Sequence, residues 1–179
     1  MKLTTKQIAT TAALLAICIV SQCFKNTSVY ITGPVINACI ILAGLCGGLI
    51  CGIILSLITP VTAFFISGSP VISAIPAIMP CIMAGNALLV SCICLLKSRF
   101  KGKSGLLFSM LIGCLLKALF MGIAISLLLI PAFLPEKMHP QMRVFQMTFS
   151  VVQLVTAVTG IVYAMILQIP IRKYLNREA

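Results

Sequence analysis

Six apolar runs follow one another along the chain, separated by polar residues, by prolines or by both. They cover residues 7–24, 34–59, 60–73, 76–96, 105–131 and 144–170. A membrane-spanning helix needs about 17 to 25 predominantly apolar residues, and five of the runs meet this requirement. The third run, 60–73, is shorter and is interrupted by Pro60, Gly68 and Pro70. Its length and composition alone therefore do not decide whether it crosses a membrane.

The basic residues decide whether the third run crosses. They gather in three clusters beside apolar runs: Lys2 and Lys6; Lys97, Arg99, Lys101 and Lys103; and Arg172, Lys173 and Arg177. Such clusters mark cytoplasmic loops, and the first two share a side only if an even number of crossings separates them. Run 60–73 must therefore cross as well, tilted or partly unwound. The sequence predicts an all-α membrane protein, a single domain over residues 1–179, with six transmembrane helices, a short third span broken by Pro and Gly, and both termini in the cytoplasm.

Composition supports a polytopic membrane protein. Hydrophobic residues make up 61% of the chain and charged residues only 8%, whereas a soluble domain carries about 25% charged residues. The net charge of +11 does not indicate nucleic-acid binding, because the basic residues flank apolar runs instead of covering a face interleaved with aromatics. Contact with anionic headgroups of the lipid bilayer is enough to explain these charges.

The residues that catalysis, metal binding or ATP hydrolysis would need are missing. The only acids are Glu136 and Glu178, and His139 is the only histidine, so acid–base chemistry and metal coordination both lack enough groups. The tripeptide Gly-Lys-Ser at 102–104 resembles the end of a phosphate-binding loop but lacks the earlier glycine of that motif. The nine cysteines lie almost entirely in apolar runs and indicate packing residues. We expect no enzyme, no cofactor and no metal, and the chain cannot hydrolyse ATP itself.

Lys117 is the residue that points most directly to a function. It lies near the middle of the stretch 106–131, which holds no other charge, and the chain offers as partners only two glutamates in its polar end regions. An ionisable side chain inside a membrane costs about 2.5 to 3.5 kcal/mol on insertion scales and by default indicates a functional site. We expect Lys117 to face a ligand cavity and its anionic partner to lie outside the protein. The alternative is that it reaches a membrane surface or hydrogen-bonds to helix carbonyls.

Polar side chains inside the apolar runs indicate where a ligand could reach. Asn37 lies at the expected start of the second helix, Asn86 lies on the fourth, and Arg143, Gln146 and Gln153 share one face of the sixth by their helical spacing. On the expected topology, Asn37, Arg143 and Gln146 are near the outer surface, and Asn86 and Gln153 lie deeper, with Lys117. These six residues predict a polar funnel open to the outside. Each amide could instead join neighbouring helices.

Small residues recur every fourth position on three helices, a spacing that lets helix backbones approach closely in lipid. Gly44, Gly48 and Gly52 do so on the second helix, and Cys114, Ala118, Gly122 and Ser126 on the fifth. We interpret both as packing seams within the bundle. The first helix carries two overlapping pairs, Ala9 with Ala13 and Ala12 with Ala16. This broad smooth face can pack internally or against a partner protein.

A small six-helix protein with these features resembles the substrate-binding S component of an energy-coupling-factor (ECF) transporter. The features that carry the resemblance extend over the whole chain: the alanine pairs of the first helix, the small-residue-rich stretch Ile40 to Ile54, Gly85-Asn86 and Lys117. The resemblance implies a vitamin-capturing subunit in the plasma membrane of a prokaryote. It also implies partners, namely a transmembrane coupling protein that carries two cytoplasmic ATPases.

The resemblance assigns roles to particular residues. Ala9, Ala12, Ala13 and Ala16 become docking residues for the coupling protein, and the segment Lys25 to Gly33 becomes a candidate lid. Lys117 and Arg143 favour an anionic vitamin, and nicotinate, pantothenate or a lipoate-like acid would each fit. The alternative from another class is a non-transport membrane scaffold or assembly subunit whose Lys117 pairs with an acid of a partner protein.

Overall fold

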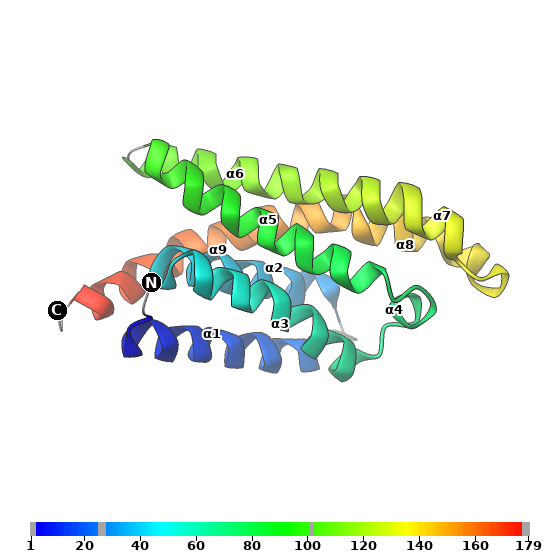
Figure 1. Cartoon of the computed structure of the whole chain (residues 1–179), viewed down its shortest axis with the longest axis horizontal. Coiled ribbons are helices and arrows are strands. Elements are labelled where there is room, and N and C mark those ends of the chain that lie inside the picture. Colours follow the sequence, from blue (N-terminus) through cyan, green and yellow to red (C-terminus); the bar gives the residue numbers. More distant parts are fainter. Residues whose placement is uncertain (1–2, 25–27, 101, 177–179) are drawn as a thin grey trace.

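The computed structural model describes residues 3–24, 28–100 and 102–176 (Figure 1). Its elements, in chain order, are α1 (Thr5–Cys23), α2 (Val29–Leu42), η1 (Ala43–Gly47), α3 (Leu49–Ser67), α4 (Pro70–Ala74), α5 (Ile78–Arg99), α6 (Gly102–Met121), η2 (Gly122–Leu129), α7 (Ile130–Phe133), η3 (Glu136–Gln141), α8 (Met142–Phe149) and α9 (Val151–Asn176). The η1 and η2 segments are π-helical and continue the helices before them. Over the described ranges, helices are the only regular secondary structure and short turns join them.

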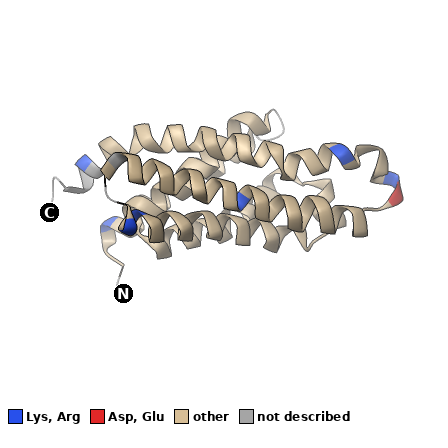
Figure 2. Ribbon diagram, turned by 90° about the horizontal axis from the view of Figure 1, so that it is seen from above, with Lys and Arg blue, Asp and Glu red and all other residues tan. Residues whose placement is uncertain are grey.

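Six helical stretches are long and apolar enough to cross a membrane, as the sequence predicts. They are Thr5–Cys23, Val29–Gly47, Leu49–Ser67, Ile78–Arg99, Ser104–Phe133 and Glu136–Ile171. They form one elongated bundle in which α1 begins and α9 ends at the same end (Figures 1 and 2). The short α4 and α7 lie at the opposite end (Figure 1). This arrangement is the one that an even number of crossings requires, while the orientation in the membrane stays a prediction.

The boundary between the second and third spans differs from the prediction. The chain turns at Gly48, where φ is +89°, and Pro60 lies inside α3. Glycine adopts a positive φ without steric cost, and transmembrane helices tolerate proline when neighbouring groups bond to the backbone beside it. Pro60 leaves the Ser56 carbonyl oxygen without its helical donor, and just beside it Gln22 Nε2 of α1 donates to the Thr59 carbonyl oxygen at 3.1 Å and holds this part of α3. The expected runs 34–59 and 60–73 are therefore wrongly divided, and the third span, Leu49–Ser67, has a full 19 residues.

Other expectations at the helix ends need correction or fall on undescribed residues. Residues 25–27 of the expected lid lie outside the described part of the chain, and Val29 to Gly33 already belong to α2. Lys2, Lys101, Arg177 and Glu178 also lie outside it. Lys97 lies in the last turn of α5 and donates from Nζ to the Leu45 carbonyl oxygen at 3.5 Å, which joins this end of α5 to η1.

The glycines of the second and third spans form a tight seam against α5. A methyl group built on Gly52 would lie 2.4 Å from Val90 Cγ1 and 3.0 Å from Gly44 Cα. This contact confirms close packing at Gly44 and Gly52. Gly48 is different, because it is the turn between two helices and a methyl group there would meet nothing within 4 Å.

Replacing Gly52 by alanine should therefore destabilise the bundle by about 1 to 3 kcal/mol, the usual effect of overpacking a well-filled interior. Thermal unfolding in mild detergent measures the loss, and Val90→Ala in the same chain should restore part of it, because it removes the obstructing methyl group. Gly122→Ala is the matched control, since a methyl group there meets only Ser150 Cβ, at 3.7 Å. Equal stability of Gly52→Ala and Gly122→Ala would contradict the seam.

Candidate functional site

A cavity of about 330 Å³ lies between the helices. Residues of α2, α3, α5, α6 and α9 form its walls, and α4 and α8 line it at the end of the bundle away from the termini (Figure 1). Its volume falls at the lower end of the range for small-molecule sites, about 300 to 1,000 Å³. The lining is mainly apolar, with Ile36, Ile72, Ile82, Phe145 and Phe149 among the larger side chains. A cavity of this kind accommodates one small molecule with an apolar body.

Lys117 brings the one positive charge among the lining residues into this cavity. It lies on the buried face of α6, between Cys114 and Met121, and only 3% of it is exposed. Its Nζ donates a hydrogen bond of 2.6 Å to Asn37 Oδ1. Lys117 therefore has a neutral hydrogen-bond partner within the protein, and an anionic partner outside the protein stays a prediction.

The charge of Lys117 is not compensated within the cavity. An ammonium group has three donors, and Asn37 accepts one of them. No lining residue is an aspartate or a glutamate. Lys117 does not extend to a membrane surface, because its side chain is buried. Its hydrogen bond goes to a side-chain amide and not to a helix carbonyl. The cavity can therefore stabilise an anionic group placed beside Nζ.

Two further amides face the same cavity without a side-chain hydrogen bond to any described residue. Asn86 on α5 is only 4% exposed, and its side chain makes no hydrogen bond with the described residues. Gln153 at the start of α9 is partly buried and likewise lacks a side-chain hydrogen bond within the described ranges. Buried amides usually have hydrogen-bond partners, so these groups are available to a ligand. Within the described ranges, no side-chain hydrogen bond of Asn86 or Gln153 joins two helices.

Asn37 lies deeper than the sequence indicated. The helix α2 begins at Val29 because Gly33 and Pro34 do not interrupt it, so Asn37 is eight residues further along, about 12 Å at the α-helical rise. The backbone around Asn37 is held by close packing on α9, where a methyl group built on Gly160 would come within 2.7 Å of Asn37 Cβ. Asn37 therefore presents its oxygen to Lys117 from a well-defined position.

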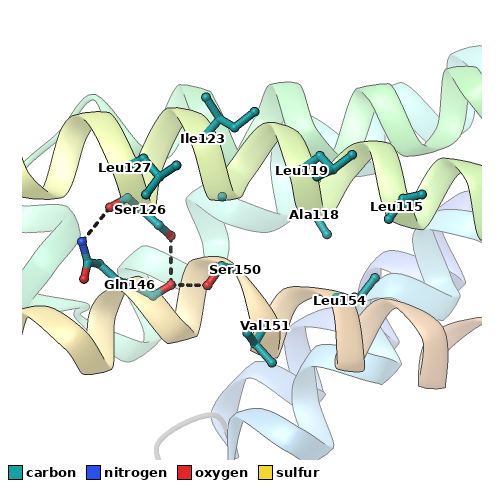
Figure 3. Close-up of a pocket in the computed structure, with 11 residues that line it drawn as sticks. Leu115, Ala118, Leu119, Ile123, Ser126, Leu127, Gln146, Ser150, Val151 and Leu154 are labelled. Carbon is teal, nitrogen blue, oxygen red and sulfur yellow. Dashed lines mark hydrogen bonds between the residues drawn. The ribbon is translucent and has the colours of Figure 1, made fainter.

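The structure does not bring Gln146 and Arg143 to the cavity. The helix breaks at Ser150, where φ is −117° and ψ is −86°, so the expected continuous face from Arg143 to Gln153 does not exist. Gln146 Nε2 donates to the Ser126 carbonyl oxygen at 2.9 Å, and Ser126 Oγ donates to the Gln146 carbonyl oxygen at 2.9 Å (Figure 3). Gln146 thus joins the fifth and sixth spans, and Arg143 is exposed outside the cavity lining. The funnel of six residues is corrected to a cavity with four of them.

The alanine face of α1 points away from the bundle. Ala9, Ala12, Ala13 and Ala16 are all exposed, whereas Leu14 and Cys18 on the opposite face are buried. The internal-packing alternative for these alanines is therefore wrong. The face is smooth, apolar and accessible along one side of the first span.

Sequence reasoning missed the apolar lining of the cavity, including Phe145 and Phe149 on α8 and Val71 on α4. Such residues look like any other apolar residues in a membrane protein, and only their position around Lys117 gives them a role. Among the described residues, no three of the His, Cys, Asp and Glu side chains gather into a possible metal site. The cysteines are all free thiols.

Comparison with known protein families gives a match that spans nearly the whole chain. The model of the family described as "ECF transporter, substrate-specific component" matches residues 6–171. Comparisons with curated proteins and with solved structures gave no match.

Proposed function

The chain belongs to the family of ECF transporter substrate-specific components, and we propose that it captures a small anionic micronutrient of vitamin type and delivers it to an ATPase-driven coupling module. As a member of this family it is a multi-pass membrane subunit of a transporter that associates with an ECF module. The module comprises a membrane coupling protein and ATPases. The anionic substrate, the vitamin class and the individual contacts are our proposal.

The uncompensated charge of Lys117 carries the proposal of an anionic substrate. A carboxylate beside Nζ would complete a charge-assisted hydrogen bond, which is stronger than a neutral one. Asn86 and Gln153 would bond to polar groups on the rest of the molecule, and the aromatic and aliphatic lining would cover its apolar part. Nicotinate, pantothenate and a lipoate-like acid are all small molecules that carry a carboxylate. The cavity does not by itself select among them.

The scaffold alternative has less support. It needs the Lys117 ammonium to meet an acid of a partner protein, yet this side chain is 3% exposed and is enclosed by α2, α5 and α9. A partner could reach it only by entering the cavity. The exposed alanine face of α1 offers a simpler partner surface, separate from the cavity.

Transport by reconstituted protein tests the proposed function. Proteoliposomes that contain this chain, a coupling protein and two ATPases should accumulate a radiolabelled small carboxylate only when ATP is supplied on the ATPase side. Vesicles with the chain alone should bind the compound without accumulating it. If the tested carboxylates accumulate without ATP, or accumulate without this chain, the proposal is contradicted.

We also propose that both termini are cytoplasmic and that the cavity opens to the outside. Truncated chains fused to reporters check this orientation. A reporter active only in the cytoplasm should work after Arg99, at the end of α5, and fail after Met138, in η3. A reporter active only outside the cytoplasm should give the reverse pattern. The opposite result for both reporters would place the cavity opening on the cytoplasmic side.

A further inference from the structure

A second hollow lies on the outer surface of the bundle, between the fifth and sixth spans. Its volume is about 430 Å³, and its walls come from α6, η2, α8 and α9. Figure 3 shows Leu115, Leu119, Ile123 and Leu127 along one wall and Val151 and Leu154 on the other. The hollow exists because small residues, Ala118 and Gly122 among them, face the break at Ser150 instead of a packed helix. We call it the lateral groove.

The lateral groove is separate from the cavity of Lys117. On α8, Val144, Phe145, Thr148 and Phe149 line the cavity, whereas Gln146 and Ser150 line the groove. These two sets lie on opposite faces of one helix. The polar groups of the groove also differ from those of the cavity: the donors Gln146 Nε2, Ser126 Oγ and Ser150 Oγ all find acceptors in the groove wall. The groove therefore suits an apolar occupant.

From these contacts we propose that the lateral groove binds one acyl chain of an anionic phospholipid, with the lipid phosphate beside Arg143. The groove extends from Leu115, near the middle of the fifth span, to Leu127, toward its α7 end. This distance is about 18 Å at a rise of about 1.5 Å per residue, close to half of a hydrocarbon core about 30 Å thick. The groove thus has the depth of one leaflet, the one at the α7 and α8 end.

The position of Arg143 accounts for the headgroup. Arg143 is exposed and lies three residues before Gln146 within α8, so it is on the groove face of that helix. It is also at the α7 end of the groove, where a headgroup of that leaflet would lie. A guanidinium matches the geometry of a phosphate and binds it with two hydrogen bonds.

A helix of a partner protein fits the groove less well. A helix about 10 Å in diameter is too wide to enter a groove of about 430 Å³ and could only rest against its open side. A single acyl chain is much narrower than a helix. The charge at one end and the apolar walls along the rest correspond to a phospholipid, with its phosphate and its chain.

Native mass spectrometry of protein extracted from vesicles of equal phosphatidylglycerol and phosphatidylcholine tests this inference. We expect the wild-type chain to retain one phosphatidylglycerol. Gly122→Leu fills the groove and should lower that occupancy at least about tenfold, because an acyl chain loses several buried methylene groups. Arg143→Gln should weaken retention about fivefold and remove the preference for phosphatidylglycerol over phosphatidylcholine.

Two matched variants serve as controls. Ala84→Leu introduces the same side chain at an exposed position of α5 outside the groove, and Lys137→Gln removes a charge at the same end of the bundle. Both should retain phosphatidylglycerol as the wild type does. Should Gly122→Leu unfold in detergent, the comparison of Arg143→Gln with Lys137→Gln still decides.

Three results would overturn the inference. The first is equal retention of the two lipids by the wild type. The second is unchanged occupancy in Gly122→Leu or Arg143→Gln. The third is loss of binding to the coupling module in Gly122→Leu with lipid retention unaltered, which would make the groove a site for a partner helix. The inference does not depend on the substrate of the cavity.

Discussion

Replacing Lys117 by methionine should weaken binding of the native substrate by two to three decades or more. Methionine keeps most of the bulk of the side chain and removes its charge. A buried ion pair that loses one member leaves the other charge uncompensated, at a cost of about 3 to 5 kcal/mol, or about a hundredfold or more in Kd. Isothermal titration of the purified chain with the substrate measures the change. The amide of the substrate should bind the wild type and the variant with similar affinity.

Lys97→Met is the matched control for this result. It makes the same chemical change at a lysine that donates to a backbone carbonyl outside the cavity, so substrate affinity should not change. Lys117→Met should also fold at least as well as the wild type without substrate, because it removes a buried cation whose one hydrogen-bond partner among the described residues is the neutral Asn37. Full affinity of Lys117→Met for the native substrate would show that Lys117 does not bind it.

Leucine in place of Ala9 or Ala13 should break the association with the coupling module. Small residues at this spacing let helices approach closely in a membrane, and added bulk in such an interface costs about 1 to 3 kcal/mol per substitution. Each substitution should weaken co-purification about tenfold to a hundredfold, and the double variant should abolish uptake. Pull-down of the coupling protein from mixed detergent extracts measures the association.

Substrate binding and folding should be unaffected in these variants, because Ala9 and Ala13 are exposed on α1 and do not line the cavity. Ala84→Leu, at an exposed position of α5, is the matched control and should keep both association and uptake. If Ala9→Leu and Ala13→Leu co-purify with the module as the wild type does, the docking surface lies elsewhere on the bundle. The assignment of the cavity would be unaffected by that result.

Much of the fold could be predicted because a helix that crosses a bilayer must be long and apolar, and composition shows where such helices lie. The number of apolar runs and the side on which basic residues gather are enough to predict six crossings. Lys117 could be recognised from sequence because a charge in a long apolar run has few structural uses. Asn86 and Gln153 stood out for a similar reason, and both line the cavity with Lys117.

Local backbone choices could not be predicted with the same reliability. In an apolar sequence, Gly48 and Pro60 are both possible breaks, and the outcome depends on which neighbours satisfy the backbone. The Gln22 bond to the Thr59 carbonyl oxygen supports α3 beside Pro60, while Gly48 takes a positive φ. The depth of Asn37 was misjudged by five residues for a related reason, because Gly33 and Pro34 do not interrupt α2 and the helix begins at Val29 instead of residue 34.

The break at Ser150 had a larger effect on the site. A periodicity argument assumes a continuous helix, and on that assumption Arg143, Gln146 and Gln153 share a face. The structure ends α8 at Phe149, so Gln146 turns to Ser126 while Gln153 faces the cavity. At the break, Ser150 Oγ donates to the Gln146 carbonyl oxygen four residues earlier at 2.6 Å, and Gln146 and Ser126 join the two spans beside it. No residue type in that segment predicts the break.

Mass spectrometry of the small molecules released from the purified chain tests the capture of an anionic substrate most directly. Protein extracted in mild detergent from cells grown in rich medium is denatured, and the released compounds are identified and counted against protein. We expect one compound with a carboxylate per chain from the wild type and from Lys97→Met, and almost none from Lys117→Met. A cationic or neutral compound, or equal amounts of the same acid from wild type and Lys117→Met, would contradict the role of the cavity.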